Sequence, residues 1–204
     1  MGTVGKLDEK KKQKREALLG AAYDLFTSQG IFDTSISDIV KKAEMAKGTF
    51  YLYFKDKFDI RTALITEKAG KLFSVVREKM RDKRADSLEE TVIQLVDIII
   101  DELEADKRML EFISKNLRWG IFHKVILEGG NEVSDSFYDW YNELIQSSGR
   151  TFRNHELMIY MIVELVNSTC YNVILYQEPV GLEELKEELA HLIPVIIRNQ
   201  EVDA

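Results

Sequence analysis

The side chains with the clearest chemistry lie close together near the start of the chain, between residues 47 and 53. Lys47, Thr49, Tyr51 and Tyr53 occupy alternate positions there. An ammonium group neutralises a phosphate, and a hydroxyl group hydrogen-bonds to phosphate oxygens or to base edges. These residue types therefore indicate recognition of a nucleic acid.

Two short helices joined by a tight turn are predicted to position these groups. Ser35, with Asp38 three residues later, forms a capping box that begins the first helix. The second helix is expected at about 46–54, with Phe50 and Phe54 four residues apart on its buried side. Such a pair is a helix-turn-helix, whose second helix can enter the major groove of DNA.

The sequence from Lys47 to Phe54, Lys-Gly-Thr-Phe-Tyr-Leu-Tyr-Phe, resembles the signature of the TetR family of bacterial transcriptional repressors. Leu25-Phe26, Gly30-Ile31-Phe32 and residues 34–43 fit the same pattern, so the resemblance covers about residues 10–60. It implies a three-helix DNA-binding head. It also implies an effector pocket enclosed by helices four to seven, and dimerisation through helices eight and nine.

The residue chemistry and the resemblance together give a set of expected DNA contacts. Gly48 lacks a side chain, which lets the recognition helix approach the DNA backbone. Tyr51 and Leu52 point toward the groove in the arrangement of the family, where they would touch base edges or thymine methyl groups. The full predicted set is Ser35, Ser37, Lys47, Gly48, Thr49, Tyr51, Leu52, Tyr53 and Lys57.

Two positions depart from the family pattern. Glu44 stands where the turn usually has glycine, and Ala46 stands where a serine usually caps the recognition helix. Loss of such a cap costs about 1 kcal/mol. The recognition helix is therefore expected to fray more easily in the free protein.

Composition and charge favour an all-α protein with two domains. Two prolines, eleven glycines and 45% hydrophobic residues are typical of a soluble helical chain. Residues 1–60 hold 11 lysines and arginines against 9 acids, whereas residues 61–204 hold 17 against 26. This asymmetry fits a DNA-binding head on an acidic body. The expected organisation, of about nine helices, is a disordered tail (1–9), a helix-turn-helix domain (10–56) and an effector-binding and dimerisation domain (57–204).

A cytoplasmic location is expected. The single cysteine, Cys170, suits a reducing compartment, and the lysine-rich start does not resemble a secretory signal. The segment from Leu157 to Tyr176 imitates a membrane span. It carries Glu164 near its centre, however, so it is interpreted as a helix buried in protein.

The second domain contains enough aromatic residues for an apolar pocket. The predicted ligand-binding set is Phe112, Trp119, Phe122, Trp140, Tyr141, Tyr160, Met161, Glu164 and Tyr171. Taken singly, each of the aromatic residues is better explained as ordinary core, and only the group predicts a pocket. A buried carboxylate must be paired, protonated or bound to a ligand. Glu164 therefore either anchors a cationic effector or pairs with an arginine or lysine at a dimer interface.

A homodimer is predicted from the last two helices. Leu182, Leu185, Leu189, Leu192 and Ile196 recur at steps of three and four, as in a seam between packed helices. The preceding helix, 154–176, is apolar on nearly all sides and needs partners on more than one face. A four-helix bundle between two subunits satisfies both helices. The alternative is a monomer that buries them internally.

Catalysis has little support in the sequence, and neither a cofactor nor a metal is expected. His123, His155 and His191 are far apart, and His155-Glu156 lacks the second histidine of a zinc-binding helix. The prediction is a repressor that a small, largely apolar effector, with a cationic group as one option, releases from a palindromic operator. The alternative is a helical small-molecule-binding protein or enzyme whose head is a protein-interaction surface.

Overall fold

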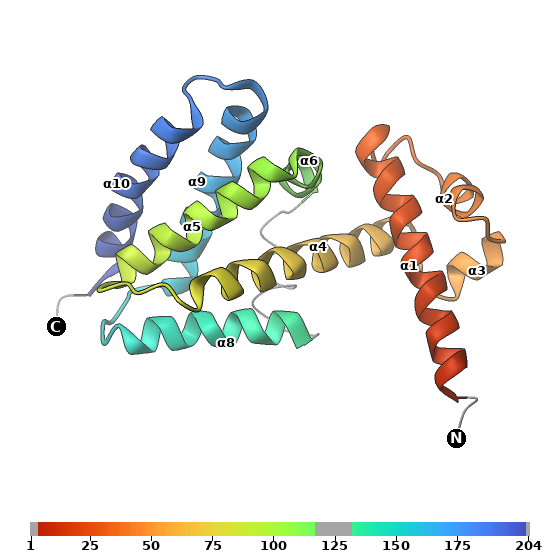
Figure 1. Ribbon diagram of the computed structural model, residues 1–204, viewed down its shortest axis with the longest axis horizontal. Helices are drawn as coiled ribbons and strands as arrows, with labels where there is room; N and C mark the ends of the chain where they lie inside the picture. Colours follow the sequence, from red (N-terminus) through yellow and green to blue (C-terminus); the bar gives the residue numbers. More distant parts are fainter. Residues whose placement is uncertain (1–3, 117–131, 203–204) are drawn as a thin grey trace. The chain divides into compact units, whose positions relative to one another are not determined.

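The computed structural model describes residues 4–116 and 132–202 of the chain. Within these ranges the chain forms nine helices, and its only β-type pairing is an isolated bridge between Phe152 and Glu201 (Figure 1). Two compact units are present, Met1–Glu67 and Lys68–Ala204, so the division falls inside a helix rather than at residue 56. The predicted all-α architecture is confirmed.

The first unit contains α1 (Val4–Ser28), α2 (Ile36–Lys42), α3 (Lys47–Tyr51) and the start of α4 (Lys57–Met80). Residues 4–9, predicted as part of a disordered tail, are helical and belong to α1. α3 is shorter than the 46–54 expected. The side chains at the centre of its core have no exposed surface, and they are Leu18, Ala22, Ile39, Phe50, Ile60 and Ile65.

The loop between α1 and α2 is held by local hydrogen bonds. Gly30 ends α1 with a φ of 89°, a left-handed conformation that glycine adopts without strain. The buried hydroxyl of Thr34 donates to the Gly30 carbonyl at 2.6 Å, and the Gln29 amide donates to the Asp33 carbonyl at 2.9 Å. These bonds fix the entry of the chain into α2.

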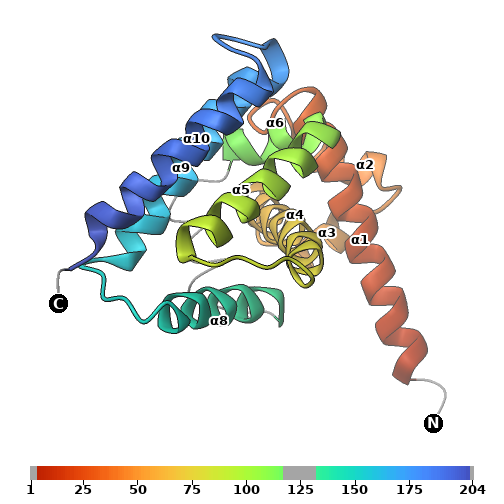
Figure 2. The same ribbon diagram turned by 60° about the vertical axis from the view of Figure 1, so that its left-hand side comes forward.

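The second unit contains the rest of α4, then α5 (Leu88–Ala105), α6 (Lys107–Asn116), α8 (Glu132–Ser147), α9 (His155–Tyr176) and α10 (Leu182–Gln200). α9 packs against α10, α6 and α5, and it runs beside α10 along most of its length (Figure 2). The N-termini of α5 and α9 are capped as their sequences suggest. Ser87 accepts from the Glu90 amide at 3.1 Å, and Asn154 accepts from the Leu157 amide at 2.8 Å.

Among the described helices, α9 is long and apolar enough to cross a membrane by length and composition. One side of α9 is nevertheless buried, including Met158, Ile162, Val166, Cys170 and Val173 at steps of three and four. Cys170 is completely covered, and burial raises the pKa of its thiol to about 12. The thiol therefore stays protonated at neutral pH and behaves as a small apolar side chain.

The leucine seam predicted on α10 is divided in the structure. Leu185 and Leu189 are buried within the subunit and continue, at steps of four, into Ile193 and Ile197. Leu192 is 44% exposed. Leu185 and Leu189 therefore pack inside their own chain, where α9 and α5 are the neighbours of α10, and do not lie on the open surface of the subunit.

Arg150 joins three separate parts of the second unit. Its Nε and Nη2 atoms donate to the two carboxylate oxygens of Glu201 at 2.8 and 2.6 Å, and Nη1 donates to both oxygens of Glu89 at 2.9 Å. The guanidinium carbon also lies over the Phe152 ring, 5.4 Å from its centroid. Main-chain bonds from Arg153 to Gln200 and from Val202 to Thr151 hold the same crossing. The C-terminal segment is thereby tied to the α8–α9 loop and to the start of α5.

Candidate DNA-binding surface and effector cavity

The predicted capping box at the start of α2 is confirmed. Ser35 Oγ accepts from the Asp38 amide at 3.1 Å, and Asp38 Oδ2 accepts from the Ser35 amide at 2.9 Å. The Ser35 hydroxyl also donates to Asp38 Oδ2 at 2.6 Å, and these bonds lower the pKa of the Asp38 carboxyl. The hydroxyl proton of Ser35 is thus already used, so Ser35 caps the helix here, while Ser37 remains exposed.

The turn between α2 and α3 shows both departures from the family pattern. Glu44 has a φ of 55°, in the left-handed region where glycine is usual. Ala46, at the N-cap of α3, makes no side-chain hydrogen bond. A left-handed conformation costs a residue other than glycine roughly 1–2 kcal/mol. The turn keeps its shape because main-chain bonds hold it, including one from the Met45 amide to the Val40 carbonyl at 2.8 Å.

α3 presents most of the predicted recognition residues to solvent. Tyr51 is 54% exposed and Leu52 80% exposed, and Lys47 is also exposed. Beneath them Phe50 is completely buried and meets the Tyr51 ring edge-on, with 5.6 Å between the centroids. Thr49 and Tyr53 are half-buried. A rigid aromatic core therefore supports an exposed row of cationic, hydroxyl and apolar groups.

Gly48 is exposed, and the fold does not require a glycine there. A Cβ atom built on Gly48 would have no neighbour within 4 Å, and the residue does not have a positive φ. Neither steric crowding nor backbone strain within the protein explains why this position lacks a side chain. A glycine here leaves the backbone open to close approach from outside the protein.

Lys57, predicted to contact a phosphate, forms hydrogen bonds within the protein. Its ammonium donates to the carbonyls of Ile31, Phe32 and Thr34 at 2.9, 3.0 and 3.1 Å. An ammonium group has three N–H donors, and here all three are occupied. Lys57 therefore fixes the α1–α2 loop from the first turn of α4. The sequence could not show this, because the carbonyls that bind it are more than 20 residues away.

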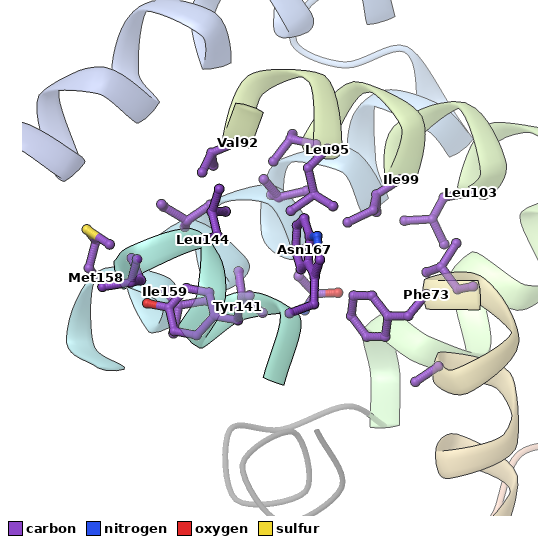
Figure 3. A pocket seen from close by; sticks show the side chains of 18 of the residues that line it. Phe73, Val92, Leu95, Ile99, Leu103, Tyr141, Leu144, Met158, Ile159 and Asn167 are labelled. Carbon is purple, nitrogen blue, oxygen red and sulfur yellow. The ribbon is translucent and has the colours of Figure 1, made fainter. Parts of the chain in front are cut away.

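An apolar cavity of about 120 Å³ lies inside the second unit, between α4, α5, α8 and α9, with one residue from α6. Its lining is almost entirely hydrocarbon, as Figure 3 shows for Leu95, Ile99 and Leu144. Asn167 supplies the one amide group among the lining residues. The Tyr141 hydroxyl donates to the His155 carbonyl at 2.7 Å, and burial raises the pKa of Tyr141, so it stays neutral. The cavity suits the apolar part of a small molecule.

Only part of the predicted ligand-binding set lines this cavity. Trp140 and Tyr141 belong to its lining, whereas the remaining described members do not: Phe112, Tyr160, Met161, Glu164 and Tyr171. Trp119 and Phe122 lie outside the described residues. α9 turns another face to the cavity, carrying Ile159, Ile162, Val163 and Val166. A helical period shows which residues share a face but not which face meets a void.

Glu164 does not occupy the position expected of an effector anchor. It is partly exposed and absent from the cavity lining, so the expectation of a buried carboxylate is wrong.

Polar groups gather in a second cavity of about 380 Å³, which is lined by residues 85–89 and 91, Leu144, Ser147, Ser148 and Arg150. Leu88 and Leu144 line both cavities. These two leucines therefore stand between an apolar space and a polar one.

An exposed recognition helix on a helix-turn-helix defines a class of DNA-binding protein, and here a helical unit with an apolar cavity follows it. Residues 18–64 match the family described as "Bacterial regulatory proteins, tetR family". The HTH-type transcriptional regulator YvdT of Bacillus subtilis is 32% identical over 148 residues, which cover 71% of this chain and 70% of that protein. The chain belongs to the TetR family and is a DNA-binding transcriptional regulator.

Solved structures show the same fold over most of the chain. The fatty acid degradation regulator FadR from Bacillus halodurans has 25% identity and a TM-score of 0.63, covering 88% of this chain and 94% of that one. FadR from Bacillus subtilis, solved in complex with stearoyl-CoA, has 22% identity and a TM-score of 0.61, covering 87% and 96%. Both likenesses extend through the second unit as well as the head.

Proposed function

We propose that the protein is a homodimeric repressor, which binds an inverted-repeat operator through paired α3 helices and leaves it when an effector enters the apolar cavity. The exposed surface of α3, built on the buried Phe50, carries the DNA-binding part of this proposal. Lys47 would contact phosphates, and Tyr51 and Leu52 would reach base edges and thymine methyl groups. Such a regulator acts in the bacterial cytoplasm, where its DNA is.

Exposed apolar side chains on α9 and α10 support the dimer. Leu157 and Tyr176 on α9 are 42% and 60% exposed, and Leu192 and Val195 on α10 are 44% and 56% exposed. These residues lie on the faces that the subunit leaves open after Leu185 and Leu189 are buried. Exposed apolar groups on neighbouring helices are typical of a contact between subunits. Two subunits bring two α3 helices to half-sites about 34–36 Å apart on B-DNA.

The cavity points to an effector with a hydrocarbon chain. Its lining offers no charged group among the described residues, so the part of the ligand inside it is apolar. The polar cavity beyond Leu88 and Leu144 would accept the other end of such a molecule. Long-chain acyl-CoA is the first compound class to test, because the FadR neighbour was solved with stearoyl-CoA. An effector shifts the equilibrium only if it prefers the state that does not bind DNA.

A binding assay tests the operator proposal. A duplex is selected from a random library with the wild-type protein. The affinity of each protein variant for this duplex is then measured at several salt concentrations. Lys47→Ala should weaken binding to every duplex and lower the salt slope by about 0.9 for each lost phosphate contact. Tyr51→Ala should instead cost about 1–3 kcal/mol on the selected duplex and relax its sequence preference.

Lys107→Ala, an equal charge change at an exposed position of α6, is the control and should bind like the wild type. If the wild type selects no inverted repeat, the operator proposal fails. If both α3 variants bind like Lys107→Ala, the assignment of α3 as the recognition helix fails.

Gly48→Ala separates DNA binding from folding. A Cβ atom at position 48 meets no protein atom, and alanine has a higher helix propensity than glycine by about 1 kcal/mol. The variant should therefore be as stable as the wild type or more stable. Its DNA affinity should fall at least about tenfold, because the new methyl group stands between the helix and the phosphate backbone. Thermal melting and a gel shift on the selected duplex measure the two effects, and unchanged affinity would show that DNA does not approach Gly48.

A further inference from the structure

The first half of α1 is a basic helical extension whose described side chains are exposed. Residues 8–17 are all exposed, and Leu18 is the first buried side chain in the part of α1 whose side chains the structure describes, from residue 8 onward. Five of the six residues from Lys10 to Arg15 are cationic. These residues belong to helix α1 (Figure 1), so their Cα–Cβ bonds point in fixed directions around its axis. We call Lys10, Lys11, Lys14 and Arg15 the basic face.

The basic face continues the packing face of α1. At about 100° per residue, its four members fall within an arc of about 140° around the helix axis. Leu18, Ala22 and Leu25, which follow one to three turns later, fall within the same arc. Glu9 and Glu16 fall on the opposite side. The cations therefore point in the direction in which α1 meets the rest of the head.

Arg15 shows where this face leads. Its guanidinium carbon lies 5.6 Å from the centroid of the Phe54 ring, in a cation–π contact. Phe54 packs on Phe50 of α3, with 5.7 Å between the ring centroids. The last member of the basic face thus contacts the aromatic core that supports the recognition helix. From Leu18 to Lys10 the helix then extends about 12 Å beyond the packed head.

We propose that the basic face binds the phosphate backbone of the DNA that flanks the base pairs read by α3. The inference rests on operator binding by α3. Charge complementarity selects this partner, because four cations on one face, next to a DNA-reading helix, suit a polyanion. Contacts of this kind carry no sequence information, so they lengthen the footprint and raise affinity without adding to the consensus.

Two duplexes test the proposal. Both carry the inverted repeat selected by the wild type, one with ten base pairs of flanking DNA on each side and one trimmed to a single base pair. The variant is Lys10→Gln/Lys11→Gln/Lys14→Gln, which leaves Arg15 on Phe54. On the long duplex it should lose about tenfold in affinity at 0.1 M salt and show a lower salt slope. On the trimmed duplex it should bind like the wild type.

Single variants provide a matched control. Lys14→Gln removes a charge from the basic face, whereas Lys12→Gln removes one from outside the arc, so only the first should weaken binding to the long duplex. Equal affinities of the triple variant and the wild type on the long duplex would overturn the proposal. An equal loss on both duplexes would also overturn it, since the lysines would then act within the head and not on flanking DNA. A wild type that binds neither duplex would instead overturn operator binding itself.

Discussion

Arg150→Met is expected to lower the free energy of unfolding of the second unit by about 2 kcal/mol. The side chains of Arg150 and Glu89 are only 21% and 18% exposed, so their charges are partly shielded from water. Removal of the guanidinium leaves Glu89 and Glu201 without their shared partner. The estimate lies between the small effect of a surface pair and the larger effect of a buried one. For a chain of this length it corresponds to a decrease of roughly 4–8 °C in melting temperature.

Arg153→Met is the matched control. Arg153 lies in the same loop but is exposed, and its guanidinium bonds only to Asn199 among the described residues. Its replacement should change the melting temperature by much less. The melting temperatures are measured by circular dichroism at pH 7. Equal decreases in the two variants would show that the Glu89–Arg150–Glu201 cluster makes no specific contribution to stability.

The same cluster predicts a pH dependence. The Arg150 guanidinium lowers the pKa of the Glu201 carboxyl below its ordinary value. A carboxyl whose folded pKa is lowered stabilises the protein above its unfolded pKa, about 4.3 for glutamate, and this contribution is lost as pH falls. The difference in melting temperature between the wild type and Arg150→Met should therefore be constant near neutral pH and narrow below about pH 4. A difference that stays constant into acid would contradict the ion-pair explanation.

The DNA-binding head could be predicted because its signals are local. Ser35 and Asp38 are three residues apart, Phe50 and Phe54 are four apart, and the capping box and aromatic core follow from those spacings. The sequence also reveals that Glu44 is unusual, because it stands where the turn normally has glycine. Its φ of 55° lies in the left-handed region, which explains the usual preference for glycine. Ser35 and Lys57 show the limit of these local signals. Their residue types predict DNA contacts, and only the structure shows that neighbouring groups of the protein also engage both side chains.

The second unit was less predictable because its organisation depends on distant contacts. The pattern on α10 shows an apolar face, yet only the three-dimensional packing reveals that Leu185 and Leu189 are covered from within the chain. The cavity lining comes from five helices, and α9 contributes Ile159 and Ile162 rather than Tyr160 and Met161. Arg150 gave no signal, since its partners lie 61 and 51 residues away along the chain.

Filling the apolar cavity should separate effector response from DNA binding. Ile99 on α5 points into the cavity (Figure 3), and Ile99→Phe would place a larger ring in that space. Overpacking a filled core costs about 1–3 kcal/mol, whereas filling a void adds contacts without that strain. The variant should therefore keep its melting temperature and its DNA affinity. Its affinity for an apolar effector should fall at least about tenfold, because the ligand and the ring compete for one volume.

Stearoyl-CoA, stearic acid and free CoA are the probes for this variant. If the hydrocarbon chain enters the cavity, the first two should shift wild-type melting or release DNA, and free CoA should do neither. Ile93→Phe is the matched control, since Ile93 is a partly exposed residue of α5 outside the lining, and it should respond like the wild type. If Ile99→Phe and Ile93→Phe respond alike to a probe that binds the wild type, the effector does not occupy this cavity. DNA release by such a probe would then have to originate at another site.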